Sequence, residues 1–182
     1  MANIRPKILV IGPSPSGKTQ IANLIAGHIE KPSETYDPTA GVRILEVFAQ
    51  QALQHSGMGD KVLVELWDEG WPAVWKDADA IIFVYDTDER AQEQDLEFYY
   101  RSFAMPLSLR DQNCVVFAHH IKPWNGTEVK LKLGKAFQRI NTFQTSIETS
   151  SDTIKREFDN LCQQAIIGAL ERRDKEEKRV FG

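Results

Sequence analysis

The eight residues GPSPSGKT at positions 12–19 constrain the fold of this chain more than any other feature. They match the phosphate-binding pattern G-x-x-x-x-G-K-[ST]. The pattern lies between an apolar run at residues 7–11 and a segment at residues 19–29 whose apolar side chains recur at helical spacing. A strand, a glycine-rich loop and a helix in this order place backbone N–H groups around phosphate oxygens. We therefore predict a nucleotide-binding domain of the α/β class.

Two side chains at the end of this loop carry most of its expected chemistry. Lys18 is expected to neutralise the β and γ phosphates, and the hydroxyl of Thr19 is expected to coordinate Mg²⁺. Pro15 is unusual, since proline offers no N–H where such a loop normally supplies a donor. The other loop residues that we expect to contact the nucleotide are Ser14, Ser16, Gly17 and Gln20.

The strands expected after this loop are of two kinds. Residues 42–49 and 61–67 are partly alternating apolar segments on either side of a polar loop, which predicts an antiparallel hairpin. Residues 80–85 and 114–118 are continuous apolar runs, which are typical of strands that helices bury on both faces.

Helical patterns alternate with these strands. We expect helices at residues 88–103 and 154–170, the second with Asp152 as its N-cap. Strands and helices that alternate in this way predict a mostly parallel sheet between two helical layers, with ligands at the carboxyl ends of the strands.

Length and composition exclude several classes of protein. The chain has 182 residues, of which 42% are hydrophobic, so residues 1–182 are expected to form one domain. A net charge of -4 makes nucleic acid or an anionic membrane an unexpected partner. The two cysteines lie far apart, which predicts neither a disulfide framework nor a zinc site. Without a long apolar run, a myristoylatable glycine after Met1 or a C-terminal cysteine, we expect a soluble intracellular protein with no lipid anchor.

The segment Tyr36-Asp37-Pro38-Thr39 precedes the first hairpin strand and resembles the first switch of the Ras and Rab GTPases. In that family the threonine closes on Mg²⁺ and the γ phosphate, so the resemblance implies that Thr39 reports a bound triphosphate. The alternative is a surface turn built on Asp-Pro.

The segment Asp68-Glu69-Gly70 looks like a second switch that is one residue shorter than the usual D-x-x-G. The resemblance implies that Asp68 holds Mg²⁺ through water and that the amide of Gly70 meets the γ phosphate. Few residues then separate Gly70 from the strand at 80–85, and no catalytic glutamine can be identified. Either the second switch is deleted, or residues are missing between Gly70 and Trp71.

The base-reading motif of the family, N-K-x-D, is replaced by His119-His120-Ile121-Lys122. The family's carboxylate accepts hydrogen bonds from N1–H and the 2-amino group of guanine, whereas a lysine has only donors. Adjacent residues of an extended chain point to opposite faces, so we expect His119, His120 and Lys122 to frame the base rather than to bind a metal.

A serine turn before the last helix is a further expected base contact. Thr145-Ser146-Ile147 and Thr149-Ser150-Ser151 both resemble the family's S-A-K turn, and the spacing to the last helix favours the first. Both could equally be turns that face solvent.

The phrases GPSPSGKT, YDPTAGVRILE, ELWDEGWPA and VVFAHHIKP together resemble the Rab-like small GTPases of the intraflagellar transport B complex, over nearly the whole chain. The resemblance implies a Ras-like G domain with a mostly parallel six-stranded sheet and one antiparallel edge strand. It also implies GTP or GDP with Mg²⁺ as ligands, and intraflagellar transport proteins seventy-four and eighty-one, a coiled-coil pair, as partners. The expected role is a nucleotide-dependent adaptor in cilium or flagellum assembly, located in the cytoplasm, at the ciliary base and in the cilium.

Hydrolysis of the nucleotide is expected to be slow or absent, because no glutamine is placed to orient water and Pro15 lacks an amide. Two alternatives remain open at this point. One is a phosphotransferase that binds ATP or ADP through the same kind of loop, and the other is a structural subunit that does not switch.

Overall fold

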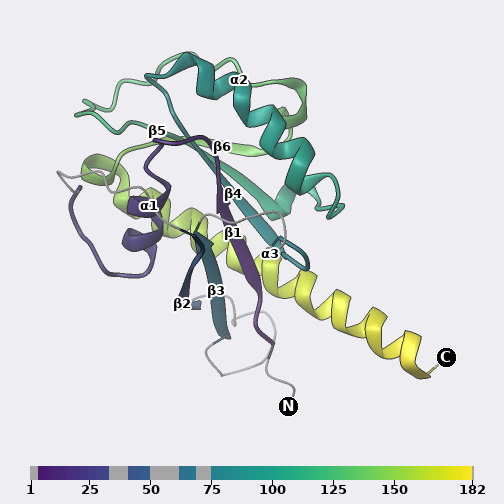
Figure 1. The fold of residues 1–182 in the computed structure, drawn as a ribbon. Coiled ribbons are helices and arrows are strands. Elements are labelled where there is room, and N and C mark those ends of the chain that lie inside the picture. The colour runs from purple at the N-terminus through teal and green to yellow at the C-terminus, as the bar shows by residue number, and fades with distance from the viewer. Residues whose placement is uncertain (1–3, 33–40, 50–61, 69–74, 182) are drawn as a thin grey trace.

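The computed structural model describes residues 4–32, 41–49, 62–68 and 75–181 (Figure 1). Two residues that the sequence assigned to the nucleotide site, Thr39 and Gly70, lie outside the described residues, as does the junction between Gly70 and Trp71. Within the described part, no helix is long and apolar enough to cross a membrane.

A six-stranded sheet with the strand order β2-β3-β1-β4-β5-β6 forms the centre of the molecule. Among the described strands, only the edge strand β2 is antiparallel to its neighbour β3, and the other four pairings are parallel. The strands are β1 (Lys7–Ile11), β2 (Arg43–Ala49), β3 (Val62–Asp68), β4 (Ala80–Asp86), β5 (Cys114–His119) and β6 (Asn141–Thr145). This architecture confirms the predicted α/β class and the single antiparallel edge strand.

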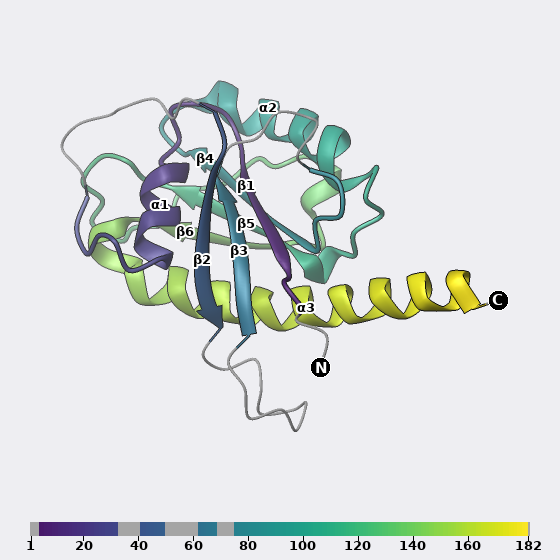
Figure 2. The same cartoon turned by 60° about the horizontal axis from the view of Figure 1, so that its bottom comes forward.

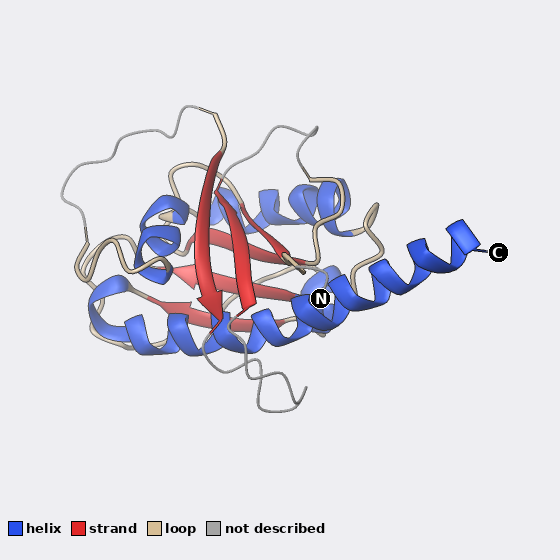
Figure 3. Cartoon of the chain, turned by 90° about the horizontal axis from the view of Figure 1, so that it is seen from below, coloured by secondary structure: helices blue, strands red, loops and turns tan. Residues whose placement is uncertain are grey.

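Helices cover both faces of the sheet (Figures 2 and 3). The helices α1 (Lys18–Ile25) and α3 (Ile147–Phe181) pack on one face, whereas α2 (Arg90–Tyr99) and the π-helical turn that continues it to Ala104 pack on the other. Figure 2 shows α3 running along the sheet and extending past it toward the C-terminus. The structure therefore has the three layers that the sequence predicted.

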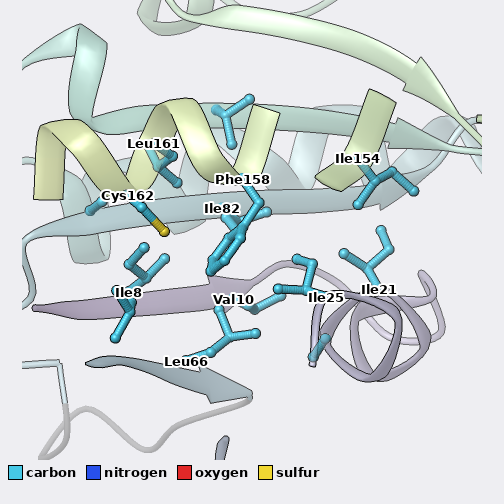
Figure 4. Packing of buried hydrophobic residues seen from close by; sticks show 14 of the residues in the cluster. Ile8, Val10, Ile21, Ile25, Leu66, Ile82, Ile154, Phe158, Leu161 and Cys162 are labelled. Carbon is cyan, nitrogen blue, oxygen red and sulfur yellow. The ribbon is translucent and has the colours of Figure 1, made fainter. Parts of the chain in front are cut away.

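Strand periodicity divides the core between the two faces. In β1, Ile8 and Val10 contribute to the cluster under α1 and α3, whereas Leu9 and Ile11 contribute to the cluster under α2, because successive side chains of a strand alternate. Figure 4 shows Ile8 and Val10 among the side chains packed between the sheet and α3. Complete burial of one such side chain stabilises the fold by roughly 1.5–3 kcal/mol.

The start of the last helix differs from the sequence prediction. The helix α3 begins at Ile147 rather than near residue 154, and it is interrupted at Ser150, whose φ of -137° and ψ of 28° are not helical. Asp152 therefore lies within α3 and is exposed, so its assignment as the N-cap is wrong. Residues 147–149 thus form a short turn before the kink, and the side chain of Ser150 holds that turn, because its Oγ accepts a hydrogen bond from the backbone N–H of Ser146 at 2.6 Å.

The other boundaries deviate less. The helix α1 ends at Ile25, four residues before its predicted end, and Gly27 follows in a left-handed conformation with φ of 75°. The strand β6 had no predicted range, because its sequence NTFQT is largely polar, as is typical of an exposed edge strand.

Candidate nucleotide-binding site

The phosphate loop connects β1 to α1 at the carboxyl edge of the sheet, where it requires glycine at both ends. A Cβ atom on Gly12 would lie 1.9 Å from the carbonyl oxygen of Val84 on the neighbouring strand. Gly17, at the N-terminus of α1, has φ of 86°, which a residue with a side chain rarely adopts. The pattern G-x-x-x-x-G therefore corresponds to two positions at which backbone geometry excludes other residues.

Lys18 is buried, and its ammonium group lies over the loop that precedes it. Its Nζ donates hydrogen bonds to the carbonyl oxygen of Pro13 and to Oγ of Ser14, each at 2.9 Å. Only 4% of Lys18 is exposed, so its positive charge is concentrated at the loop rather than dispersed in solvent. Ser16 is also buried, and in the part of the chain that the structure describes its Oγ has no hydrogen-bond partner. This loop offers an anion both a cation and a hydroxyl group.

Gln92, which the sequence analysis did not identify, ties the loop to the end of β4. Its Nε2 donates to the carbonyl oxygen of Pro15 at 2.7 Å, and its Oε1 accepts from the backbone N–H of Asp86 at 2.8 Å. The side chain is 6% exposed. Its spacing of four residues from the buried Leu96 places both on the inner face of α2, and this spacing is the signal that could have identified Gln92.

Two of the three residues predicted to bind Mg²⁺ come from adjacent elements at the carboxyl ends of the strands, and the third, Thr39, lies outside the described residues. Thr19 lies in the first turn of α1, and Asp68 ends β3 with its Cα paired in register with Val10 of β1. A hydroxyl and a carboxylate are oxygen ligands of the kind that Mg²⁺ prefers, and such sites take few protein ligands besides phosphate oxygens. The described residues contain no cluster of three or more His, Cys, Asp or Glu side chains that could hold a metal ion. The two residues fit a magnesium site.

His119 links the base side of the site to the phosphate loop. It ends β5 with 1% of its surface exposed, and its Nδ1 lies 3.1 Å from Oγ1 of Thr145 at the end of β6. Its ring lies against Gly17, where an added Cβ would come within 2.6 Å of Cδ2. Burial, reinforced by the neighbouring His120, lowers the pKa of His119 to about 4. The imidazole is therefore neutral at physiological pH.

The ring of His120 points elsewhere, as predicted for adjacent residues of an extended chain. Its Nδ1 lies 2.8 Å from Oγ1 of Thr87, and its ring stacks on Trp124 with 4.3 Å between the ring centroids. Lys122 follows in an exposed loop, with Nζ 3.7 Å from Oδ2 of Asp88. The two imidazole rings therefore have different hydrogen-bond partners.

A cavity of about 180 Å³ lies beside these residues. Its lining residues are Gln20, Pro32, His119, His120, Ile121, Lys122, Pro123, Ser146, Ile147 and Glu148. Ser146 and Ile147 of Thr145-Ser146-Ile147, the serine turn that the spacing favoured, therefore line the cavity. In the competing turn, Ser150 and Thr149 instead hydrogen bond to Ser146.

The structure thus places nearly all the predicted site residues near the carboxyl ends of the strands. These are Ser14, Pro15, Ser16, Gly17, Lys18, Thr19 and Gln20 from the loop and α1, Asp68 from β3, His119, His120 and Lys122 from β5 and its loop, and Thr145, Ser146 and Ile147 from β6 and α3. Glu148 and Gln92 join them without having been predicted. The roles assigned to these residues toward a ligand remain predictions.

Comparison with known proteins identifies full-length relatives. The intraflagellar transport protein 22 homolog of Homo sapiens is 32% identical over 187 residues, which cover 98% of this chain and 99% of that protein. Intraflagellar transport protein 22 of Trypanosoma brucei brucei is 32% identical over 191 residues, covering 90% of this chain and 87% of that protein. No protein-family model matches the chain.

Solved structures give the same result. The GTP-bound crystal structure of T. brucei IFT22 superimposes with a TM-score of 0.70 at 32% identity, covering 92% of this chain and 99% of that one. The GDP-bound form gives a TM-score of 0.68 at 34% identity, over 89% and 96% of the two chains. A GTP-bound T. brucei IFT22/74/81 structure gives 0.73 at 32% identity, over 92% and 98%.

Proposed function

Because this chain belongs to the intraflagellar transport protein 22 family, we propose that it binds GTP and GDP with Mg²⁺ and acts as a nucleotide-dependent subunit of the intraflagellar transport B complex. The observation that carries the proposal is the buried Lys18 at the phosphate loop, on the same sheet edge as the cavity beside His119. Lys18 would bind the phosphates of a nucleotide, and the cavity would hold its base.

The phosphate end is bound by charge and backbone geometry. Phosphate oxygens would compete for the ammonium group of Lys18 with the two oxygens that it now contacts, and they carry more negative charge. Thr19 and Asp68 would hold Mg²⁺, which supplies charge neutralisation between the phosphates when bound. The hydroxyl of Ser16 is placed within the same loop.

Slow hydrolysis is part of the proposal. Pro15 has no N–H to stabilise charge that develops on the bridging oxygen during phosphoryl transfer. Its carbonyl oxygen is moreover fixed by Gln92, so the loop is held at this residue. With no glutamine identified after Gly70 to orient water, the protein would retain its triphosphate for long periods.

The partners and location follow from the relatives. The T. brucei IFT22/74/81 structure supports intraflagellar transport proteins 74 and 81 as the partners of this chain. We propose that Thr39 and Gly70, ordered by the γ phosphate, form part of the surface that those partners recognise. The protein would then work in the cilium or flagellum and load at the ciliary base from the cytoplasm.

Chromatography of the nucleotide released from denatured protein, together with titration of GDP, GTP and ADP, tests the proposal. We expect guanine nucleotides to be recovered and to bind more tightly than ADP. Recovery of adenine nucleotides, with phosphate transfer to an acceptor, would establish the phosphotransferase alternative instead.

A further inference from the structure

The side chain of Gln92 connects α2 to the middle of the phosphate loop. Its Nε2 donates a hydrogen bond to the carbonyl oxygen of Pro15 at 2.7 Å, and its Oε1 accepts one from the backbone N–H of Asp86 at 2.8 Å. Only 6% of the residue is exposed. A buried amide that is hydrogen bonded through both of its polar atoms has one orientation, so Gln92 holds the carbonyl oxygen of Pro15 in one place.

The held carbonyl group belongs to the peptide bond between Pro15 and Ser16. A peptide unit is planar, and it is trans when the second residue is not proline, so its C=O and N–H point in opposite directions. The carbonyl oxygen lies on the side of α2, and the N–H of Ser16 is therefore directed away from α2. Loops of this pattern bind phosphate oxygens through backbone N–H groups, whereas a carbonyl oxygen repels them.

The neighbouring parts of the loop are held by other contacts. Nζ of Lys18 donates to the carbonyl oxygen of Pro13 and to Oγ of Ser14, which fixes the first half of the loop. The helix α1 begins at Lys18 and fixes the other end. The contact from Gln92 falls between these two, at the residue whose own N–H is missing because it is a proline.

The N–H of Ser16 matters more in this loop because it follows a missing donor. If the peptide unit after Pro15 rotated, the loop would lose a second N–H and would present a carbonyl oxygen in its place. Ser16 is only 1% exposed, so water would do little to screen that oxygen from a phosphate.

We propose that Gln92 is a positioning residue for phosphate binding, which acts through the carbonyl oxygen of Pro15 to direct the N–H of Ser16 toward the β phosphate. This role rests on the proposed function, since it requires that the loop binds a nucleoside diphosphate or triphosphate. Gln92 does not itself contact the nucleotide. Its donor keeps the peptide unit in the orientation that binds an anion, so α2 contributes to nucleotide affinity through one side chain.

The variant Gln92→Met tests this role, because methionine has a similar length and cannot donate to Pro15. GDP and GMP, which lacks the β phosphate, compete with a fluorescent GDP analogue for the natural protein and for the variant. The variant is expected to bind GDP about 10-fold more weakly, the cost of one hydrogen bond to a charged group, and to bind GMP within about 2-fold of the natural protein. Gln94→Met is the matched control, since Gln94 is an exposed glutamine on the same helix, and it should leave both affinities unchanged.

A second measurement uses the natural protein, so it does not depend on how well the variant folds. In nuclear magnetic resonance spectra of the ¹⁵N-labelled protein, the amide proton of Ser16 should shift downfield when GDP binds and much less when GMP binds, because the hydrogen bond to the β phosphate forms only with GDP. In Gln92→Met saturated with GDP, this shift should be reduced.

The outcomes separate this role from the proposed function. If Gln92→Met binds GDP as tightly as the natural protein does, or loses GDP and GMP affinity equally, the positioning role is overturned and the proposed function stands. An amide proton of Ser16 that responds equally to GDP and GMP also overturns the role. If the natural protein binds no guanine nucleotide, both are overturned.

Discussion

His119 should make the stability of this protein sensitive to mild acid. In the folded chain its pKa is about 4, against the ordinary value of 6.5, because the ring is buried and His120 adjoins it. An unfolded chain accepts a proton on this histidine as the pH falls below 6.5, whereas the folded chain resists until about 4. Stability is therefore fully present above the unfolded pKa and is lost as the pH falls through this window.

The size of the loss follows from the difference between the two pKa values. The whole window corresponds to about 3 kcal/mol, and acidification from about pH 7 to about pH 5 accounts for about 2 kcal/mol of it. Asp79 acts in the opposite direction, because burial raises its pKa from 3.8 to about 6, so its folded carboxyl group binds a proton more readily. Acidification therefore stabilises the fold through Asp79 and partly masks the effect of His119.

The variant His119→Asn separates the contribution of this histidine to the pH dependence of stability from the contributions of other titrating groups. Asparagine at position 119 has a side-chain atom at the level of Nδ1, so it can maintain the hydrogen bond to Thr145 without titrating. Urea unfolding of the nucleotide-free natural protein and of His119→Asn, each at about pH 7 and about pH 5, gives the two free energies of unfolding. Asp79 precedes β4 and therefore lies at the amino ends of the strands, far from His119 at their carboxyl ends. Its contribution is the same in both proteins and cancels in the comparison.

We expect the natural protein to lose about 2 kcal/mol more than His119→Asn over this interval. Equal losses in the two proteins would refute the conclusion that His119 is held neutral by burial. A larger loss in the variant would mean that the imidazole accepts a proton in the folded state and is stabilised there.

Three further predictions concern the nucleotide. Lys18→Ala should abolish binding of a fluorescent GDP analogue, and tight binding in this variant would remove Lys18 from the phosphate site. Pro15→Gly should raise the single-turnover rate of GTP hydrolysis, since the loss of one hydrogen-bond donor of this kind costs on the order of 10² to 10³ in rate. An unchanged rate with binding intact would show that the missing backbone N–H at position 15 does not limit hydrolysis. Finally, a GTP analogue should strengthen binding to a coiled-coil partner by roughly 1 to 3 kcal/mol relative to GDP, and Thr39→Ala should reduce this difference. Identical affinities with the two nucleotides, measured by calorimetry, would indicate a constitutive subunit.

Much of the fold could be predicted because it depends on local pattern. The continuous apolar runs of β4 and β5 indicated central strands, and the phosphate-loop pattern fixed the order of β1 and α1. The predictions failed where a polar side chain competes with the backbone. Ser150 interrupts α3 after a short first turn. Hydroxyl groups of this kind hydrogen bond to several backbone positions in short segments, so periodicity alone does not locate the break.

The candidate site was predictable in its parts but not in its connections. Lys18, His119 and Ser146 could be assigned from motifs, whereas Gln92 and Glu148 belong to no motif, and the spacing of Gln92 from Leu96 indicates only that it faces inward. Gln92 contacts Pro15 across 77 positions of sequence, and Glu148 lies at the cavity in the short turn that precedes the kink of α3. Each contact depends on how the strands assemble.

These long-range contacts make the two ends of the site one mechanical unit. The ring of His119 packs on Gly17 and its Nδ1 adjoins Thr145, so the phosphate loop, β5 and β6 meet at one buried side chain. Gln92 makes a second connection between the same loop and β4. A base that positions the ends of β5 and β6 therefore acts on the loop that holds the phosphates, because a close-packed interior transmits small displacements instead of absorbing them. The histidine at this position is better explained by this linking role, for which a neutral ring with two nitrogens is suited, than by direct recognition of the base edge.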